Sequence, residues 1–259
     1  MRAIILAAGM GRRLGAAANA IPKCLLEFGG KSLLHRSLSI LREHGVEDVV
    51  MGVGYLAGQI EQALAVFATD SRVELVHNPG YERGSIVTLW MLRQSMVRGG
   101  DILLMDADTL FDSRLLECLT QTKYENCLLL DRDPGANGES VKLCVRDGLP
   151  AELRKNIDPG EHYDLVGEMA GLVKLSTDCA RRLADASQSY IDRGRLDEEY
   201  EEALRDVVLG DPERFGIEEC TGLPWIEIDF PDDVQRARQD VLPRLYDDCK
   251  SGEERCNCA

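Results

Sequence analysis

The sequence predicts an α/β fold, in which a Rossmann-like, mostly parallel mixed sheet is flanked by helices and carries a small β-rich accessory or lid region. Three observations predict it. Apolar runs alternate with amphipathic stretches in the first half of the chain, a glycine-rich turn directly follows the first apolar run, and turn-separated apolar runs replace the alternation near residue 126. Strand–helix alternation of this kind favours parallel strands covered by helices on both faces.

In the first half of the chain we expect four strands and three helices. Apolar runs bounded by polar or turn residues indicate strands at 3–7, 48–53, 73–76 and 101–105. Apolar residues at helical spacing indicate helices at 32–44, 58–67 and 86–96. Gly45 is a suitable end for the first of these helices, because glycine adopts the left-handed conformation after a helix at little cost.

The second half of the chain does not continue the strand–helix alternation of the first half. We expect strands at 127–131, 141–146 and 170–175, separated by glycine- and proline-containing turns at 134–138 and 158–160. A long helical stretch follows at 177–209, then a short strand at 225–229 that stops before Pro231, and a closing helix at 232–245. We expect residues 1–246 to form a single domain and the polar residues 247–259 to be a disordered tail.

Composition limits the classes of ligand. The chain has 259 residues, of which 44% are hydrophobic, so it can bury a substantial core. Its formal net charge of -15 repels nucleic acid and anionic lipid, which argues against a nucleic-acid partner. Any anionic ligand must therefore be held by individual Arg and Lys residues set against an acidic surface.

The cysteines and the N-terminus predict a cytoplasmic protein with no membrane insertion. The nine cysteines are scattered and lie mostly in apolar runs, as reduced core thiols do in the cytosol. The apolar stretch at the N-terminus is too short to span a bilayer. Because Gly-Met-Gly-Arg-Arg interrupts it, we interpret it as a buried strand rather than as a signal peptide.

The glycine-rich turn after the first strand is the first candidate site. In open α/β sheets ligands bind beyond the carboxyl ends of the strands, and small residues let backbone N–H groups approach a base and phosphates closely. Arg12 and Arg13 in this turn can neutralise phosphate charge. The turn matches neither of the common phosphate-binding loops, so alone it is weak support. Its candidate nucleotide-binding residues are Leu6, Ala7, Ala8, Gly9 and Gly11.

Lys23, which follows Pro22, is the second candidate. It lies on a segment that returns to the sheet and could reach the same phosphates. A solvated surface lysine is the alternative interpretation.

Acidic residues at strand ends predict a metal site. Asp106 and Asp108 close a hydrophobic strand, where a lone carboxylate is costly to bury, and their spacing puts both on one side of the strand. Asp229 ends the late strand in the same way. Mg²⁺ prefers one or two carboxylates together with phosphate oxygens and water. The alternative is that these aspartates cap helices or sit in solvated turns, as we expect for Asp232 and Asp233.

Taken together, these patterns resemble a known family. Residues 6–14, read as Leu-Ala-Ala-Gly-x-Gly-x-Arg-Leu, and 22–25, read as Pro-Lys-x-Leu, resemble the signature of the sugar-nucleotide pyrophosphorylases and cytidylyltransferases. The likeness continues through 29–34, 78–81, 106–108 and 226–229, and is loose in the middle of the chain. It implies a fold of the nucleotide-diphospho-sugar transferase type, with residues 1–125 binding the nucleotide and 126–246 binding the acceptor.

The resemblance also implies roles. Residues 6–11 would hold base and sugar, Arg13 and Lys23 would act on the triphosphate as catalytic residues, and Asp108 and Asp229 would hold Mg²⁺. A phosphate oxygen of the acceptor would attack the α-phosphorus in line with departing pyrophosphate, so no enzyme nucleophile is needed. The remaining nucleotide-binding residues that we expect are Tyr81, Gly84, Ser85 and Asp106.

The branch that the chain most resembles uses CTP with phosphocholine, aminoethylphosphonate or inositol phosphate. It departs from that branch at residues 83–88, where asparagines are usual, which leaves the base open. Tyr200 within the acidic run 197–202 suits a cationic head group, although such a run is commonly a solvated helix face. The lysines and Glu168 could equally be surface residues. The acceptor-binding residues that we expect are Lys155, Lys142, Glu168, Tyr200 and Glu201.

Other functions stay open at this point. A sugar-1-phosphate nucleotidyltransferase that uses UTP, dTTP or GTP would carry the same signature. A glycosyltransferase also places Asp-x-Asp at a strand end, but the basic turn and Pro22-Lys23 argue against it. A regulatory nucleotide-binding module without turnover is the alternative outside enzymes. The sequence leaves the oligomeric state open, with a homodimer as one option.

Overall fold

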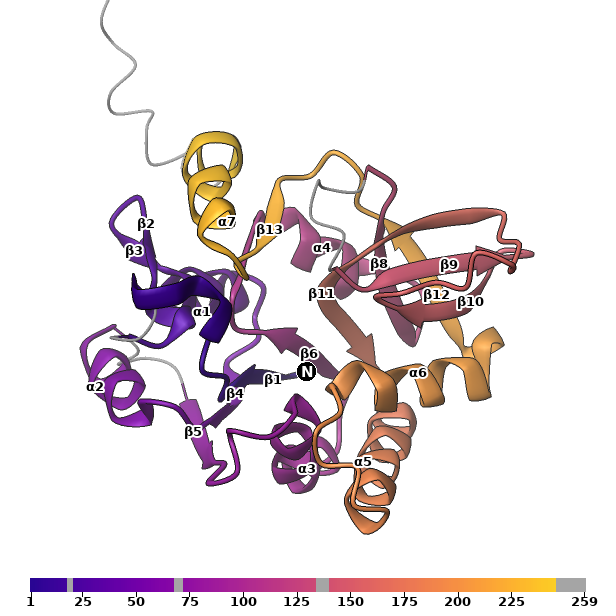
Figure 1. The fold of residues 1–259 in the computed structure, drawn as a ribbon, viewed down its shortest axis with the longest axis horizontal. Coiled ribbons are helices and arrows are strands. Elements are labelled where there is room, and N and C mark those ends of the chain that lie inside the picture. The colour runs from indigo at the N-terminus through magenta and orange to yellow at the C-terminus, as the bar shows by residue number, and fades with distance from the viewer. Residues whose placement is uncertain (18–20, 68–71, 134–139, 246–259) are drawn as a thin grey trace, which may run out of the picture.

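A central sheet of nine strands organises the computed structural model, which describes residues 1–17, 21–67, 72–133 and 140–245 (Figure 1). The strands run in the order β10-β9-β11-β6-β1-β4-β5, and β8 and β12 continue the sheet from β11. Their bounds are β1 Arg2–Ala7, β4 Asp48–Val53, β5 Arg72–His77, β6 Ile102–Asp106, β8 Asn126–Asp131, β9 Lys142–Arg146, β10 Leu149–Arg154, β11 Leu165–Leu175 and β12 Phe215–Glu219.

The four strands β6, β1, β4 and β5 are parallel, as the alternation predicted. β11 joins them antiparallel to β6 and also pairs antiparallel with β8 and β9. The β-rich second half therefore continues the main sheet as a mixed sheet. Two small ladders lie beside it, β7 (Thr109–Phe111) with β13 (Trp225–Glu227) and β2 (Glu27–Phe28) with β3 (Lys31–Ser32).

Helices cover both faces because neighbouring strand residues point to opposite sides. Ile5 in β1 packs in one buried cluster with α1, α2 and α4, whereas Ile4 packs in another with α3, α5 and α6. In Figure 1, α1 and α2 lie apart from α3 and α5 on either side of the central strands. The helices are α1 Leu33–Glu43, α2 Ala57–Phe67, α3 Ser85–Met96, α4 Ser113–Gln121, α5 Thr177–Asp192, α6 Tyr200–Gly210 and α7 Pro231–Arg236.

Several expected elements need correction. The helical stretch at 177–209 is two helices, because α5 ends before Gly194, which has a φ of 70°, and α6 begins at Tyr200. The closing helix expected at 232–245 is present but changes its winding: α7 is followed without a break by a π-helix at Ala237–Val241 and a 3₁₀ helix at Leu242–Arg244. Six strands and helices were not expected at all, namely β2, β3, β7, α4, β10 and β12.

Two expectations fall partly or wholly outside the described residues: the turn at 134–138 and the tail at 247–259. The division into a nucleotide half and an acceptor half stays a prediction. Among the described helices, none combines the length and the apolar character that crossing a membrane would require.

Candidate functional site

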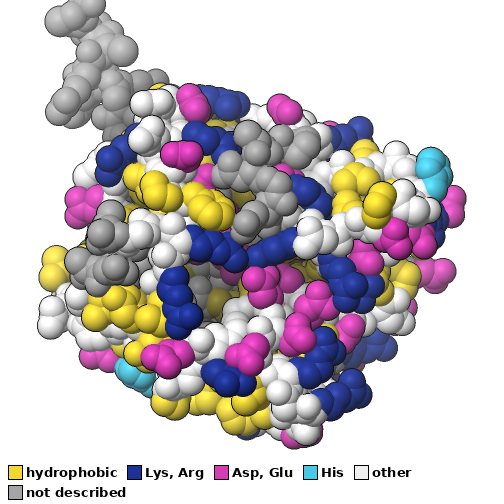
Figure 2. Space-filling model, viewed as in Figure 1, with side chains coloured by type: hydrophobic (Ala, Val, Ile, Leu, Met, Phe, Trp, Pro, Cys, Tyr) yellow, Lys and Arg dark blue, Asp and Glu magenta, His cyan; other side chains and the backbone are white. Residues whose placement is uncertain are grey.

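A cleft opens where β1 and β6 end side by side, with Leu6 paired to Asp106. Figure 2 shows a hollow near the middle of this face, bordered by basic side chains on one side and acidic side chains on the other. The cleft gathers most of the residues that the sequence singled out. It is lined by Leu6, Ala8, Gly9, Gly11, Arg12, Arg13, Lys23, Tyr81, Arg83, Ser85, Thr88, Asp106, Asp108, Lys155, Glu199, Tyr200, Glu201, Glu227 and Asp229.

The glycine-rich turn forms one wall of this cleft. Gly11 has a φ of 60°, and a Cβ atom there would lie 2.9 Å from Cγ of Lys23, so only glycine allows the lysine stem to pass. The N–H of Leu14 donates to the Gly11 carbonyl at 3.0 Å and closes the turn. The N–H of Tyr55 donates to the Ala8 carbonyl at 3.1 Å, which ties the turn to the loop after β4.

Lys23 lies between two carboxylates at the centre of the cleft. Its Nζ donates to Oδ2 of Asp108 at 2.9 Å and to Oδ1 of Asp229 at 2.7 Å. Arg13 Nη1 reaches Oδ2 of Asp229 at 3.4 Å. Four residues from three distant parts of the chain therefore converge on one point. The Lys23 side chain is 15% exposed and each aspartate side chain is 21% exposed, so the ions are only partly hydrated.

The backbone holds Asp229 opposite Asp108. The N–H of Ile228 donates to the carbonyl of Asp108 at 3.0 Å, which extends the β7–β13 ladder to the two carboxylates. Oδ2 of the buried Asp233 accepts hydrogen bonds from the N–H groups of Asp229 at 3.0 Å and Phe230 at 2.7 Å. Asp233 thus caps the start of α7, as the sequence predicted, and fixes the segment that carries Asp229.

Burial and charge set the protonation of these groups. Burial alone would lower the pKa of Lys23, but the Asp108 and Asp229 carboxylates outweigh it and raise that pKa. Burial would raise the pKa of Asp229, yet the nearby Lys23 ammonium lowers it. Glu227 has no such partner: burial, and then the charges of Asp108 and Asp229, raise its pKa well above the usual value. The lysine and Asp229 are therefore ionised at neutral pH.

The other end of the cleft is acidic and aromatic. Tyr200 Oη donates to Oδ2 of Asp106 at 2.8 Å. Burial raises the pKa of Asp106, and the charges of Glu201 and Glu227 add to this. Burial, and then the charge of Glu199, raises the pKa of Glu201 to about 7. Oε2 of Glu201 is buried without a hydrogen-bond partner, so this end of the cleft has an acceptor available for a ligand donor.

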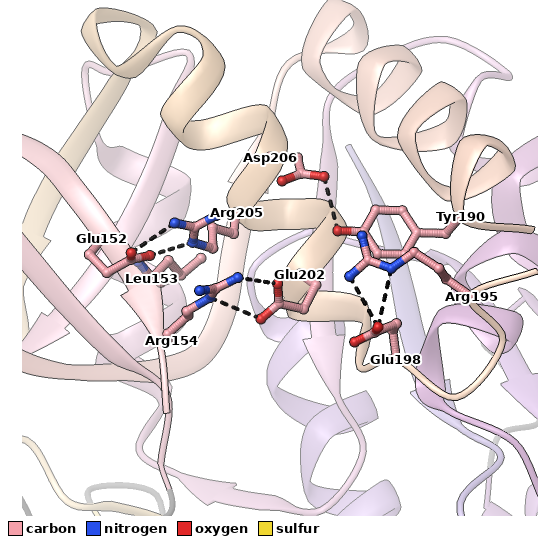
Figure 3. Close-up of polar contacts among 9 residues, drawn as sticks. All are labelled: Glu152, Leu153, Arg154, Tyr190, Arg195, Glu198, Glu202, Arg205 and Asp206. Carbon is pink, nitrogen blue, oxygen red and sulfur yellow. Dashed lines mark hydrogen bonds and ion pairs between the residues drawn. The ribbon is translucent and has the colours of Figure 1, made fainter. Parts of the chain in front are cut away.

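Helix α6 brings Tyr200 and Glu201 to the cleft, and its other polar residues anchor it (Figure 3). Arg205 forms a two-pronged ion pair with Glu152 of β10, and Glu202 pairs with Arg154 at 2.9 Å. Oδ2 of Asp206 accepts from the Tyr190 hydroxyl of α5 at 2.9 Å. Within the acidic run 197–202, Glu202 therefore helps to anchor α6, whereas Glu199 and Glu201 line the cleft.

Four of the predicted site residues lie elsewhere. Ala7 lines a smaller cavity behind Lys23 and Asp108. Gly84 packs against the chain before α6, where a Cβ atom would come within 2.0 Å of the Glu198 carbonyl oxygen.

Lys142 and Glu168 are paired to each other at 2.7 Å on the neighbouring strands β9 and β11. Glu168 lines a second cavity with Asp131 and Trp225, and this cavity shares Glu227 and Asp229 with the main cleft. Lys155 lines the main cleft, as expected, and pairs with Glu199 at 2.7 Å.

Sequence reasoning missed some cleft residues. Glu227 ends β13 two positions before Asp229, and that spacing could have identified it, because alternate residues of an extended chain share a face. Arg83 and Glu199 carried no comparable signal. Two details of the metal prediction change. β6 ends at Asp106, so Asp108 lies in the turn that follows, and β13 ends at Glu227, so Asp229 lies just beyond the strand that it was expected to end. Asp106 and Asp108 nevertheless both face the cleft, with different partners.

The donor set fits a hard divalent cation. Carboxylate oxygens of Asp108, Glu227 and Asp229 lie within 4.8 Å of one another. Oxygen-only sets of this kind suit Mg²⁺, which takes few protein carboxylates and completes its shell with phosphate oxygens and water.

Comparison with known proteins identifies the family of the chain. Residues 3–190 match the family model of the MobA-like NTP transferase domain. Among curated relatives, CMP-5'-(3-aminopropyl)phosphonate synthase of Streptomyces rubellomurinus is 24% identical over 92% of this chain and 38% of its own length. The bifunctional IPC transferase and DIPP synthase of Thermococcus kodakarensis is 24% identical over 92% of this chain and 50% of its own length. Choline-phosphate cytidylyltransferase of Streptococcus pneumoniae is 31% identical over 48% of this chain and 52% of its own length.

Solved structures show the same fold. CTP:phosphocholine cytidylyltransferase from Streptococcus pneumoniae superposes with a TM-score of 0.75 at 20% identity, covering 92% of this chain and 97% of that one. The inositol-1-phosphate CTP transferase from T. maritima superposes with a TM-score of 0.73 at 20% identity, covering 94% and 95%. The chain spans about half the length, or less, of the curated relatives named above. On the family match, supported by the fold and the converging cleft residues, this chain belongs to the MobA-like NTP transferase family.

Proposed function

We propose that this chain is a nucleotidyltransferase that joins the nucleoside monophosphate of CTP to a small phosphorylated or phosphonate acceptor and releases pyrophosphate. The convergence of Arg13, Lys23, Asp108 and Asp229 beside the glycine-rich turn carries the proposal. The names of the relatives support the choice of nucleotide and acceptor, because they describe CMP-phosphonate and choline-phosphate chemistry. UTP, dTTP or GTP with a sugar 1-phosphate stays the alternative.

Each part of the cleft has a task in this reaction. The backbone of residues 6–11 holds the base and sugar, and Tyr81 and Ser85 line the same cleft. Arg13 and Lys23 neutralise the charge that develops on the α-phosphate and on departing pyrophosphate. An acceptor phosphate is already ionised at neutral pH and attacks in line, so these residues need only position and neutralise the reactants.

Asp108 and Asp229, with Glu227 beside them, would hold Mg²⁺, which supplies charge neutralisation at the transferred phosphoryl group. Before the triphosphate binds, the positive charge of Lys23 offsets the negative charges of Asp108 and Asp229. A bound triphosphate then provides both a partner for the lysine and additional oxygen ligands for the cation.

The acidic end of the cleft favours an acceptor with a cationic head group. Glu201 contributes a buried oxygen without a partner, and Asp106, Glu227 and Tyr200 surround the same region. Carboxylates and an aromatic ring attract ammonium groups. Lys155 at the cleft edge can leave Glu199 for the acceptor's phosphate or phosphonate. Inositol phosphate is the rival acceptor because hydroxyl groups could also donate to Glu201.

A substrate panel tests the proposal. CTP, UTP, GTP and dTTP are each paired with phosphocholine, aminoethylphosphonate, inositol 1-phosphate and glucose 1-phosphate, and pyrophosphate release is followed. We expect turnover with CTP and a cationic acceptor. Lys23→Ala and Asp108→Ala should fold normally and lose transfer, whereas near-normal turnover by folded variants would refute the assignment. Consumption of a nucleotide sugar without a triphosphate would indicate a glycosyltransferase instead, and nucleotide binding without any transfer would indicate a regulatory module.

A further inference from the structure

The position of the Lys23 ammonium has a consequence for metal binding. One nitrogen atom bridges the two carboxylates, at 2.9 Å from Oδ2 of Asp108 and 2.7 Å from Oδ1 of Asp229. Those carboxylates belong to the set of three that suits a cation. Lys23 is thus a positive charge already seated among the oxygens that a divalent cation would use.

We propose that Lys23 is a tethered counter-ion that competes with the divalent cation for Asp108 and Asp229, and that it moves to the triphosphate when the cation binds. This inference rests on the proposed function for the second position of the lysine, but the competition itself does not require turnover. The lysine would then act at two places: between the carboxylates before substrate binds, and against phosphate oxygens afterwards.

The local structure allows the Lys23 side chain to change partners. The chain before Lys23 is held by Pro22, and the carbonyls of Pro22 and Lys23 accept hydrogen bonds from Leu25 and Leu26 at 2.9 Å each. The backbone is therefore fixed, while the side chain passes over Gly11, where no Cβ blocks it. A long side chain on a fixed backbone can change partners by rotamer changes alone.

Electrostatics makes the competition strong. A dication and an ammonium at the same pair of oxygens repel each other, and at 15% to 21% exposure water screens this repulsion only in part. Without Lys23, Asp108, Glu227 and Asp229 would face one another with no ammonium between them. Cation affinity should therefore rise when the ammonium is removed.

The competition also couples the two ligands. A triphosphate that draws Lys23 away frees Asp108 and Asp229 for the cation, and a cation that displaces Lys23 frees it for phosphate. By thermodynamic linkage each ligand then raises the affinity for the other by the same factor. We infer that the nucleotide and the metal bind as a cooperative pair rather than independently.

The first test measures Mn²⁺ binding to nucleotide-free protein by electron paramagnetic resonance. Lys23→Gln should bind Mn²⁺ at least about tenfold more tightly than the unaltered chain, because the competing charge is gone. Lys23→Arg keeps the charge and should show no such gain. The matched control is Lys155→Gln, which removes a lysine from the same cleft that pairs with Glu199 and acts on Asp229 only from farther away, so its Mn²⁺ affinity should rise much less than that of Lys23→Gln. Equal affinity of Lys23→Gln and the unaltered chain would overturn the proposal.

The second test uses the unaltered chain, so it does not depend on a variant that folds. Limiting acetylation of lysine amines, read by mass spectrometry, should increase at Lys23 on addition of saturating Mg²⁺ without nucleotide, while Lys155 serves as the internal reference. Unchanged labelling of Lys23 at Mg²⁺ saturation would also contradict the competition. A positive result in both tests with no transfer in the substrate panel would leave this inference standing and remove the proposed function.

Discussion

At the scale of single residues, the acidic side chains of the cleft need nearby positive charges to offset them. Asp108, Glu227 and Asp229 are three acids within reach of one another, and the nearby bases are Lys23 and Arg13. Buried or half-buried carboxylates are tolerated only when cations or hydrogen bonds offset them. Lys23 stabilises the folded chain in this way, and the same carboxylates remain suited to a metal ion.

Replacing Asp108 by Asn should abolish most transfer while the fold is kept. The change removes one charge beside the transferred phosphate but preserves the size of the side chain, so we expect the transfer rate to fall by about 10²–10³-fold. The rate of pyrophosphate release with CTP and the best acceptor measures this. Asp185→Asn, which alters an exposed aspartate on α5, is the control and should retain full activity. A rate within a few fold of the parent for Asp108→Asn would contradict the role.

Glu201 should make stability depend on pH. Its pKa is about 7 in the folded chain, and burial is the main cause, against 4.5 for an ordinary glutamate. Because the pKa of Glu201 is higher in the folded chain than in the unfolded chain, its contribution to the free energy of unfolding is fully present below about pH 4.5 and is lost as the pH rises through about 7. Glu201→Gln cannot ionise, so it should be more stable than the parent by about 3 kcal/mol at pH 8.5 and by less than about 1 kcal/mol at pH 5.

Urea unfolding at the two pH values measures this difference. The control is Glu82→Gln, an exposed glutamate in the loop before α3, which should give the same small effect at both values. If the free energies of unfolding of Glu201→Gln and the parent differ by the same amount at pH 5 and pH 8.5, burial does not raise the pKa of Glu201.

The residue scale also shows what sequence reasoning could reach. Lys23 was predicted because it follows Pro22 on a segment that returns to the sheet and matches the Pro-Lys signature of the family. Asp108 and Asp229 were predicted because each follows or ends an apolar run, and such positions place polar groups at the sheet edge. Glu168 and Lys142 satisfied a similar pattern, yet they neutralise each other at 2.7 Å and lie outside the main cleft. Strand neighbours on β9 and β11 decide that pairing, and their register is a long-range property.

At the scale of elements, α6 is the helix that positions the acidic end of the cleft, where we propose that the acceptor binds. Its first turn carries Tyr200 and Glu201, and its later turns carry Arg205 and Asp206, which bind β10 and α5 (Figure 3). A helix that is anchored away from the cleft can hold its first residues still, which is what a binding site on a helix end needs.

Loss of the Arg205 anchor should affect the acceptor more than the nucleotide. Arg205→Gln leaves Glu152 half-buried without its partner, and we expect a loss of about 1–3 kcal/mol in the free energy of unfolding. The KM for the acceptor should rise, while the KM for CTP changes little. Unfolding and kinetics with each substrate varied in turn measure both.

The matched control is Arg98→Gln, which breaks the exposed pair with Glu74 near the other end of the sheet. Exposed pairs contribute about 0–1 kcal/mol, so this variant should remain near the parent in stability and in both KM values. Equal effects of the two variants would mean that the Arg205–Glu152 pair does not position α6.

Elements in the parallel half could be predicted because hydrophobic periodicity is local. The strands at 48–53 and 101–105 and the helix at 86–96 appear within one or two residues of their expected bounds. β10 and β12 were missed because each mixes polar with apolar residues along an only partly covered strand. Their strand state depends on pairing with β9 and β8, which the local pattern does not encode.

At the scale of the whole molecule, the cleft depends on contact between the two halves of the chain. The N–H of Gly84 donates to the Leu196 carbonyl at 2.9 Å, and the N–H of Ile86 donates to the Glu198 carbonyl at 3.2 Å. These bonds join the start of α3, in the first half, to the segment that leads into α6. Close backbone approach at this point requires a residue without a side chain.

Gly84→Ala should therefore disturb both stability and the site. Its Cβ atom would lie 2.0 Å from the Glu198 carbonyl oxygen, so the two segments must separate, at a cost of about 1–3 kcal/mol. Acceptor affinity should fall with stability because Tyr200 follows directly. Gly58→Ala in α2 is the control: no atom lies within 4 Å of the added Cβ, and we expect a gain of about 0.5 kcal/mol. If Gly84→Ala keeps the stability and acceptor affinity of the parent, Gly84 and the segment before α6 are not closely packed in solution.

The amino-acid sequence by itself determined the α/β architecture, the parallel core and the residues of the glycine-rich turn. These follow from periodicity and turn chemistry, which act between neighbours in the chain. Only the tertiary structure decided that Lys23 bridges Asp108 and Asp229, that Glu227 joins them, and that Lys142 takes Glu168 as its partner. The physical reason is strand order and register: they bring together side chains more than 80 positions apart, such as Lys23 and Asp108, and no local pattern carries that information.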